Sequence, residues 1–209
     1  NIKMAGKKLK PHLMDALERL EYEAPFPFQK KIIPRIKSGA NIFGIGPHGC
    51  GKTTAMIIGT LQKLDSRAFE DAPRALIFVK DNQEAEALEE KFREFIRHMD
   101  VRIFTAFDGP DIEKQKLAIY EGMDIVIGTP QRLNKLFLIS GIDVNQLKLF
   151  IVEDAEFLSK SQDFNNLIEV SNHISRCQFL VFASEFHPRL ERLQDLFMEH
   201  SEVVEEVQT

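Results

Sequence analysis

Tryptophan is absent from the 209 residues, tyrosine occurs only twice, and the only cysteines are Cys50 and Cys177. Two cysteines are too few for a disulfide framework or a thiolate metal site, so we expect a reducing, cytoplasmic environment. No apolar run approaches the roughly 18 residues that cross a bilayer, and the start of the chain lacks a signal-peptide pattern, so we expect no membrane contact. Basic residues are not in excess either, because the net charge of the chain is −5. This charge excludes a protein that coats nucleic acid through bulk charge, while a local basic groove remains open.

The remaining composition is that of a folded protein. Hydrophobic residues make up 44% and charged residues 28%, which excludes wholesale disorder, and the 17 phenylalanines indicate buried packing. The length favours one large domain, because single cores extend to about 250 residues before they divide. The first residue is Asn1 instead of methionine, and we expect the sequence to be part of a longer protein.

Short apolar runs alternate with longer amphipathic stretches. Six runs are apolar on both faces, as the strands of a covered parallel sheet require: residues 41–45, 75–79, 101–106, 124–127, 149–152 and 178–182. Eight stretches have helical spacing: residues 9–20, 29–36, 53–64, 83–98, 112–120, 132–139, 164–174 and 188–197. This alternation predicts an α/β fold, a doubly wound and mainly parallel sheet flanked by helices. We expect an N-terminal helical flank over residues 1–40, the sheet domain over 41–200, and a frayed acidic tail over 201–209.

A glycine-rich segment joins the first predicted strand to the next predicted helix. Residues 46–53 read Gly-Pro-His-Gly-Cys-Gly-Lys-Thr and match the phosphate-binding loop, whose backbone N–H groups and following helix N-terminus cradle phosphate oxygens. Lys52 is expected to reach the outer phosphates and Thr53 to bind Mg²⁺. The residues expected at the nucleotide are Gly46, His48, Gly49, Cys50, Gly51, Lys52, Thr53 and Thr54. Two interpretations stay open: His48 as a simple surface histidine, and Cys50 as a small filler or a redox residue.

Segments on both sides of this loop have a recognisable order. Residues 21–29 read Glu-Tyr-Glu-Ala-Pro-Phe-Pro-Phe-Gln, residues 128–133 read Gly-Thr-Pro-Gln-Arg-Leu, and residues 153–156 read Glu-Asp-Ala-Glu. With the phosphate loop, they resemble the N-terminal RecA-like domain of DEAD-box RNA helicases along nearly the whole chain. The resemblance implies that Gln29 of the Q motif reads adenine. It places the aromatic residue that stacks on adenine near Met4, and puts Phe26 where the family has a small hydroxyl residue.

The resemblance also implies a surface for single-stranded RNA. Thr129, Pro130 and Arg132 match the TPGR segment, and Gly109 matches the second glycine of a paired-glycine contact. The family's PTREL segment is replaced by Lys-Asp-Asn-Gln-Glu at residues 80–84. We therefore expect weak RNA binding through Gly109, Thr129, Pro130 and Arg132. A solvated cation at a helix start is the alternative interpretation of Arg132.

The acidic segment differs from the family's Asp-Glu-Ala-Asp in the length of every carboxylate. The resemblance assigns Glu153, with Thr53, to the Mg²⁺ site and Asp154 to the attacking water. Glu153 is one methylene longer than the family residue, and Asp154 is one methylene shorter. Because an error of about 1 Å can cost roughly a hundredfold in rate, we expect weak catalysis.

The family's Ser-Ala-Thr segment, which couples the nucleotide to RNA, reads Ala-Ser-Glu at residues 183–185. The resemblance implies coupling through Glu156, Ser184 and Glu185, and we expect the hydroxyl contacts with the carboxylate motif to be lost. The family's second RecA-like domain, with its arginine fingers, is missing from the sequence. Arginine fingers contribute about 10³ to 10⁵ in rate, so we expect negligible hydrolysis by this segment alone.

Three functions remain in view. The favoured one is a degenerate first domain of a DEAD-box RNA helicase, a pseudo-helicase scaffold that binds ATP with Mg²⁺ or RNA with little or no hydrolysis. The alternatives are an active ATP-dependent RNA helicase whose second domain lies elsewhere, and a protein-interaction module in RNA silencing. The pattern of altered motifs is similar to that of tudor-domain-bearing helicase-like proteins of the piRNA pathway. This similarity implies silencing proteins as partners and ribonucleoprotein granules as a location.

Overall fold

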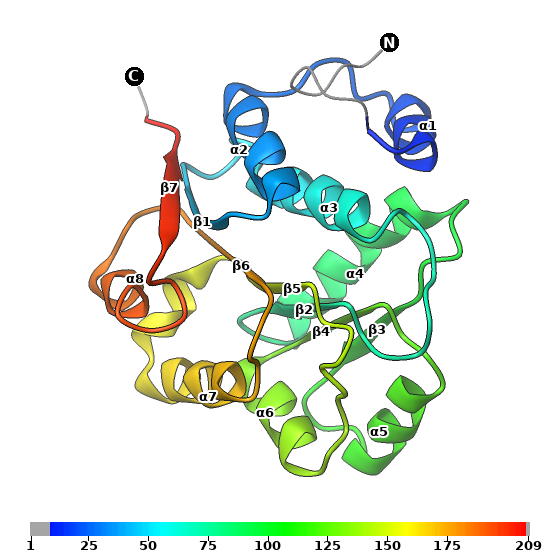
Figure 1. The fold of residues 1–209 in the computed structure, drawn as a ribbon, viewed down its shortest axis with the longest axis vertical. Helices are drawn as coiled ribbons and strands as arrows, with labels where there is room; N and C mark the ends of the chain where they lie inside the picture. The colour runs from blue at the N-terminus through cyan, green and yellow to red at the C-terminus, as the bar shows by residue number, and fades with distance from the viewer. Residues whose placement is uncertain (1–8, 208–209) are drawn as a thin grey trace.

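The computed structural model of the chain describes residues 9–207. Within them a seven-stranded sheet runs through the middle of the molecule, with helices on both faces (Figure 1). The strand order is β3-β4-β2-β5-β6-β1-β7, and every neighbouring pair is parallel. The strands are β1 Asn41–Ile45, β2 Ala75–Phe78, β3 Ile103–Ala106, β4 Ile125–Gly128, β5 Leu149–Val152, β6 Gln178–Ala183 and β7 Ser201–Glu205. The α/β doubly wound prediction is confirmed.

The described residues also form eight α-helices and one short 3₁₀-helix, of which α1 and α2 precede the first strand. They are α1 Pro11–Arg19, α2 Pro27–Ser38, α3 Lys52–Lys63, α4 Asn82–Ile96, α5 Ile112–Tyr120, α6 Pro130–Leu138, α7 Ser161–Asn172, α8 Pro188–Leu193 and the 3₁₀-helix η1 Ala155–Ser159. All eight predicted helices are present, and the largest error is at α8, which ends at Leu193 instead of residue 197. Between residues 9 and 207, no helix has both the length and the apolar character that crossing a bilayer requires.

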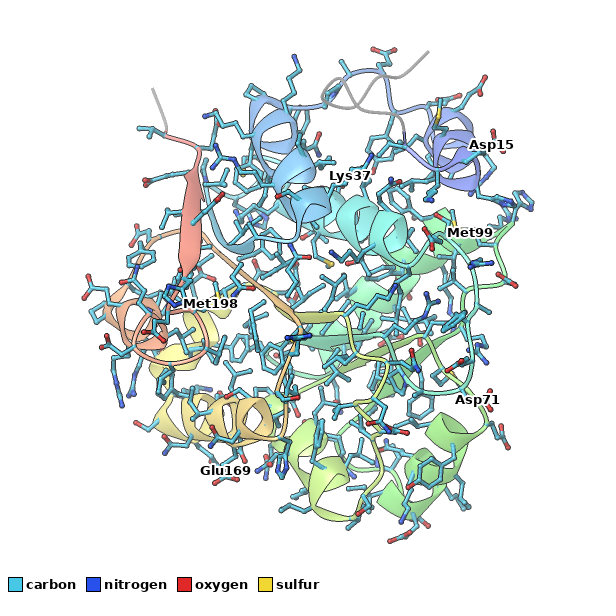
Figure 2. All side chains as sticks on the ribbon, in the orientation of Figure 1. Asp15, Lys37, Asp71, Met99, Glu169 and Met198 are labelled. Atoms are coloured by element: carbon cyan, nitrogen blue, oxygen red, sulfur yellow. The ribbon has the colours of Figure 1, made fainter. Side chains whose placement is uncertain are left out.

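The strands bury side chains on both faces because helices cover both faces. In β2, Ile77 belongs to the core beneath α1, α2, α3 and α4, whereas Leu76 and Phe78 belong to the core beneath α6, α7 and α8. This alternation follows from the two-residue repeat of a strand. Met198, labelled beside α8 in Figure 2, is fully buried in the second core, while Asp15 on α1 is exposed.

The carboxyl ends of the parallel strands bring distant segments to one edge of the sheet. The glycine-rich loop follows β1, residues 80–84 follow β2, residues 107–110 follow β3, Thr129 follows β4, Glu153 follows β5, and Ser184 follows β6. Open α/β sheets bind their ligands at this edge. Every predicted site residue except Gln29 therefore lies in a loop, or at the start of a helix, at this edge.

The predicted fraying of residues 201–209 is wrong for residues 201–205. These residues form β7, which pairs in parallel with β1 at the end of the sheet. Salt bridges join Glu202 to Arg35 and Glu206 to Lys31, so acidic side chains near β7 face basic side chains of α2. The tail is ordered by tertiary contacts that its own sequence pattern does not reveal. The predicted position near Met4 lies outside the described residues.

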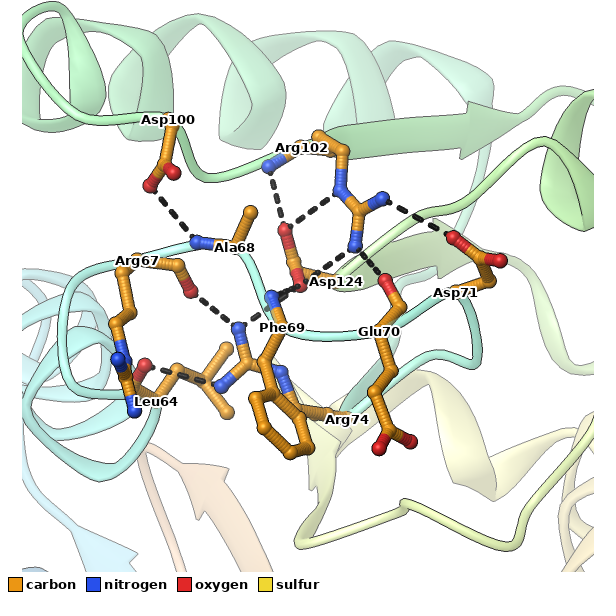
Figure 3. A network of polar contacts seen from close by, with 10 residues as sticks. All are labelled: Leu64, Arg67, Ala68, Phe69, Glu70, Asp71, Arg74, Asp100, Arg102 and Asp124. Atoms are coloured by element: carbon orange, nitrogen blue, oxygen red, sulfur yellow. Dashed lines mark hydrogen bonds and ion pairs between the residues drawn. The ribbon is translucent and has the colours of Figure 1, made fainter.

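A buried ionic network stabilises the opposite, amino-terminal edge of the sheet (Figure 3). Asp124, directly before β4, accepts hydrogen bonds from the guanidinium groups of Arg74 at 2.8 Å and Arg102 at 3.1 Å. Arg74 also donates to the carbonyl of Leu64 at 3.0 Å, at the end of α3. Burial would raise the pKa of Asp124, but the hydrogen bonds from Arg102 and Arg74 outweigh it and lower the pKa. The network ties the connection between α3 and β2 to the starts of β3 and β4.

Candidate functional site

The glycine-rich loop between β1 and α3 has a backbone that only its glycines adopt easily. Gly49 and Gly51 have φ angles of +87° and +94°, in the left-handed region that disfavours side chains. A Cβ on Gly51 would also lie 2.5 Å from Nε2 of Gln29, so a side chain has no space there. The loop turns its backbone toward the N-terminus of α3, which begins at Lys52. This is the arrangement that binds phosphate groups.

The ammonium group of Lys52 lies inside this loop. It donates hydrogen bonds to the carbonyl oxygens of Gly46 and Pro47, the latter at 3.0 Å, and it is almost fully buried. Cys50 is half-buried with its Sγ 3.9 Å from the same ammonium group, which supports the small-filler interpretation. His48 is exposed at the outer side of the loop. The positive charge of Lys52 therefore lies at the base of the loop.

A hydroxyl and a carboxylate meet beside the loop. Thr53 Oγ1 donates to Oε2 of Glu153 at 3.0 Å, and Glu153 is buried. Burial, with the charge of Asp154, raises the pKa of Glu153 to about 7, although the hydrogen bond from Thr53 and the charge of Lys91 oppose this rise. The other carboxylate oxygen, Oε1, is buried and has no hydrogen-bond partner among the described residues. An unpartnered carboxylate oxygen beside a threonine hydroxyl fits Mg²⁺, which binds oxygen ligands.

Two adjoining pockets extend from this pair. One of about 290 Å³ is lined by Phe26, the glycine-rich loop, Thr54 and Asp154, and one of about 270 Å³ lies between the loop, α4 and the end of β5. Asp154 and Lys91 line both pockets. Asp154 is exposed and adopts a left-handed backbone with φ +47°, which is uncommon for a residue with a side chain. Lys91 on α4 was not predicted, and no sequence motif marks it.

Gln29 and Phe26 pack against the loop from the start of α2. Gln29 is buried; its Oε1 accepts from the backbone N–H of Phe26 at 2.8 Å, and its Nε2 donates to the carbonyl of Gly51 at 3.3 Å. Both polar ends of Gln29 are thus used within the protein, which joins the Q-motif segment to the glycine-rich loop. Phe26 is 52% exposed and faces the pocket. The substitution seen in the sequence therefore places an aromatic ring beside the candidate nucleotide site.

The expected loss of hydroxyl contacts to the carboxylate motif is wrong at Ser184. Its hydroxyl donates to Oε1 of Glu156 at 2.8 Å, and its backbone N–H donates to the same oxygen. Burial would raise the pKa of Glu156, but these hydrogen bonds outweigh it and lower the pKa. Glu185 is exposed, and its side chain makes no ion pair within residues 9–207. A hydroxyl contact between the ends of β5 and β6 is therefore retained.

The predicted RNA-contact residues lie together at the ends of β3 and β4. Thr129 caps the N-terminus of α6 by accepting from the backbone N–H of Arg132 at 3.2 Å, and Pro130 occupies the first helical position. Gly109 has a φ of +108°, and a Cβ added to it would meet no atom within 4 Å. Arg132 is only 8% exposed, so the interpretation as a solvated cation is wrong. Asp108 contacts both Thr129 and Arg132, which the sequence pattern did not predict.

Comparisons with known proteins agree with this arrangement. The DEAD/DEAH box helicase family matches residues 26–187. The chain is 30% identical to the ATP-dependent RNA helicase ddx23 of Dictyostelium discoideum over 70% of its own length and 18% of that protein. It is 27% identical to the ATP-dependent RNA helicase DeaD of Escherichia coli over 94% of its own length and 31% of that protein. The chain therefore spans less than a third of either relative.

Solved structures show the same fold. A DEAD-box protein from Methanococcus jannaschii superimposes with a TM-score of 0.88 at 18% identity, covering 98% of this chain and 56% of that one. The RNA helicase Prp28 from Chaetomium thermophilum bound to ADP gives 0.81 at 22% identity, covering 100% and 51%. With the family match across the glycine-rich loop, the carboxylate motif and Ser184, these similarities show that the chain is a RecA-like domain that belongs to the DEAD/DEAH box helicase family.

Proposed function

We propose that the chain is the degenerate first domain of a DEAD-box RNA helicase, which binds ATP with Mg²⁺ and hydrolyses it slowly or not at all. The observation that carries this proposal is the pairing of Thr53 with Glu153 at the glycine-rich loop, 3.0 Å apart. It supplies two oxygen ligands where the outer phosphates of a nucleotide would lie.

The binding residues act together at the loop. Lys52, which donates to the carbonyls of Gly46 and Pro47, would bind the outer phosphate oxygens through its flexible ammonium group. Thr53 and Glu153 would hold the metal ion through their side-chain oxygens. When bound, Mg²⁺ neutralises charge on the outer phosphates. The phosphate loop is thus complete for binding.

Hydrolysis demands more than binding, and the chain departs from the family at that step. The water-orienting position holds Asp154, whose carboxylate ends one methylene short and lies on an exposed, left-handed residue. A general base must come within about 3 Å of the proton it takes. Glu153, one methylene longer, is buried against Thr53 and cannot replace it. Slow hydrolysis follows from this exchange of lengths.

Titration with a fluorescent ATP analogue tests nucleotide binding. We expect saturable binding with Mg²⁺ that Lys52→Ala weakens by at least tenfold, because the lysine charge faces the outer phosphates. Lys114→Ala, on the exposed surface of α5, is the charge-matched control and should bind like the native chain. Absence of saturable binding at millimolar nucleotide would leave the loop a purely structural turn.

An active ATP-dependent RNA helicase is the second candidate, and one contact favours it. Ser184 donates to Glu156 at 2.8 Å, so the ends of β5 and β6 remain linked as the coupling of nucleotide to RNA requires. In that case the missing catalytic groups come from a second domain elsewhere in the protein. Binding of single-stranded RNA, partners in RNA silencing, and a cytoplasmic or ribonucleoprotein-granule location stay predictions of the family resemblance.

A further inference from the structure

The residues that would contact RNA are already engaged by an acidic side chain of the same chain. The hydroxyl of Thr129 donates to the carboxylate of Asp108, in the loop after β3. The hydroxyl oxygen lies 3.0 Å from one carboxylate oxygen and 3.1 Å from the other. The same carboxylate lies 3.7 Å from Nε of Arg132. A hydroxyl and a guanidinium group directed at one carboxylate form the kind of donor set that also binds a phosphate.

Thr129 has no donor left for another ligand. A threonine hydroxyl carries one proton, and here Asp108 accepts it, while the backbone N–H of Arg132 donates to the same hydroxyl oxygen at 3.2 Å. Arg132 Nε is buried and has no hydrogen-bond partner within residues 9–207, and one terminal nitrogen donates to the carbonyl of Pro110 at 3.3 Å. The guanidinium group is therefore held behind Asp108 and reaches solvent poorly.

Several contacts fix Asp108 in this place. The backbone N–H of Asp108 donates to Oδ1 of Asn82 at 2.8 Å, and Nδ2 of Asn82 donates back to the carbonyl of Asp108 at 2.9 Å. Gln115 on α5 donates to the carbonyl of Phe107 at 2.9 Å. Since these bonds involve the backbone, the loop keeps its position whether or not residue 108 has a carboxylate. Asn82 lies in the segment that replaces PTREL, so two departures from the family meet in one contact.

The charge at this position is unfavourable for a polyanion. The Asp108 side chain is 42% exposed, so it faces an approaching phosphate directly. Asp163, at the start of α7, is close enough to interact with that charge: burial raises its pKa, the positive charge of Lys160 opposes this rise, and the negative charge of Asp108 adds to it. The negative charge of Asp108 beside Thr129 repels phosphate, whereas the family pattern has a glycine at position 108.

We propose that Asp108 occupies the place of an RNA phosphate between Thr129 and Arg132 and so holds the RNA surface of this domain in a low-affinity state. The proposal rests on the RNA surface assigned above by family resemblance. It makes Asp108 a determinant of affinity that acts by charge and by occupying donors, without unfolding the loop.

Anisotropy of a fluorescein-labelled oligouridylate, titrated with the 209-residue chain at low salt, tests the proposal. Asp108→Asn keeps the size of the side chain and removes its charge, and Asp108→Gly restores the family residue. We expect about fivefold tighter binding for Asp108→Asn and at least as much for Asp108→Gly, because one like charge at contact distance is removed. The slope of log affinity against log salt should steepen by about 0.7 for each additional RNA phosphate that the variant binds.

Two further variants separate the possible results. Asp195→Asn, an exposed change of equal charge near the end of α8, should bind like the native chain. Thr129→Val in the Asp108→Gly background should reduce the increase in affinity, since it removes the hydroxyl that the loss of the Asp108 carboxylate releases. Melting curves show that each variant is folded.

The outcomes distinguish this inference from the proposed function. If Asp108→Asn and Asp108→Gly bind no tighter while Thr129→Val still weakens the native binding, the RNA surface is correct and the role of Asp108 is wrong. If neither position affects binding, the RNA surface itself is wrong, and this inference is overturned with it. Nucleotide binding, tested separately with Lys52→Ala, remains unaffected by either result.

Discussion

Thr53 and Glu153 lie 100 residues apart in the chain, and the hydroxyl of one donates to the carboxylate of the other at 3.0 Å. The contact exists because β1 and β5 are parallel and end at the same edge of the sheet, with only β6 between them. Glu153 also keeps one buried oxygen without a hydrogen bond to any described residue. The two side chains together form the part of the site most suited to a divalent cation.

Removing the hydroxyl of Thr53 tests this assignment. Thr53→Val keeps the shape of the side chain and should lower Mg²⁺-dependent nucleotide affinity by about tenfold, because one oxygen ligand is lost. Affinity measured in excess chelator is the control and should match that of the native chain. Equal Mg²⁺ dependence in both chains would place the cation elsewhere.

Phe26 places an aromatic ring at the pocket, where the family pattern has a small hydroxyl residue. It is 52% exposed beside Gly51, and aromatic stacking on a base contributes about 1 to 3 kcal/mol. Phe26→Ala should therefore weaken ATP binding by roughly fivefold or more in a fluorescence titration. Tripolyphosphate, which lacks a base, should bind both chains equally. A parallel loss for tripolyphosphate would mean that Phe26 only supports the loop.

The ionic network around Asp124, at the amino-terminal edge of the sheet, should make the stability of the folded protein depend on pH in acid. Because Arg102 and Arg74 lower the folded-state pKa of Asp124, its contribution to stability is complete above the unfolded value of about 3.9. That contribution is lost as pH falls through the lower folded-state pKa. Asp124→Asn should remove this pH dependence below about pH 5 in chemical denaturation.

At neutral pH the same variant should be strongly destabilised. Arg74 and Asp124 are both buried, so the substitution leaves Arg74 without its counter-charge at a cost of about 3 to 5 kcal/mol, or roughly 10 °C in melting temperature. Asp71→Asn is the matched control, because Asp71 pairs with Arg102 at 3.7 Å on the surface and is 79% exposed. It should cost at most about 1 kcal/mol. Similar losses for both variants would show that burial of the network has no effect.

Much of this fold could be predicted from the sequence, because buried parallel strands have a simple pattern of consecutive apolar residues. Residues 75–79 and 149–152 are apolar on both faces, which few structures other than a covered sheet require. The segment 201–205 reads Ser-Glu-Val-Val-Glu and gives no such signal. It becomes β7 because it pairs with β1 and because Glu202 within it and Glu206 after it contact α2, and both partners are distant in sequence.

Parts of the candidate site could be predicted where a sequence motif fixes the local backbone geometry. They could not be predicted where contacts between distant segments determine the position of a side chain. The spacing of Gly49, Gly51 and Lys52 identified the loop, since the required backbone angles are encoded locally. The contact of Asp108 with Thr129 joins two loops. The sequence indicates only that the family's glycine is absent at position 108. Ser184 retained a partner because Glu156, one methylene longer than the family's aspartate, reaches its hydroxyl.

The exchanged lengths of Glu153 and Asp154 should limit RNA-stimulated ATP hydrolysis, which is measured on the full-length protein. The native protein should turn over far more slowly than the roughly 1 per second at the low end of typical enzymes. The double variant Glu153→Asp with Asp154→Glu should raise this rate at least about tenfold, and each single change should do less, since both errors must be corrected. A native rate of about 1 per second or more, or a double variant that loses activity the native protein has, would show that the site works with the exchanged lengths and that the protein is an active enzyme.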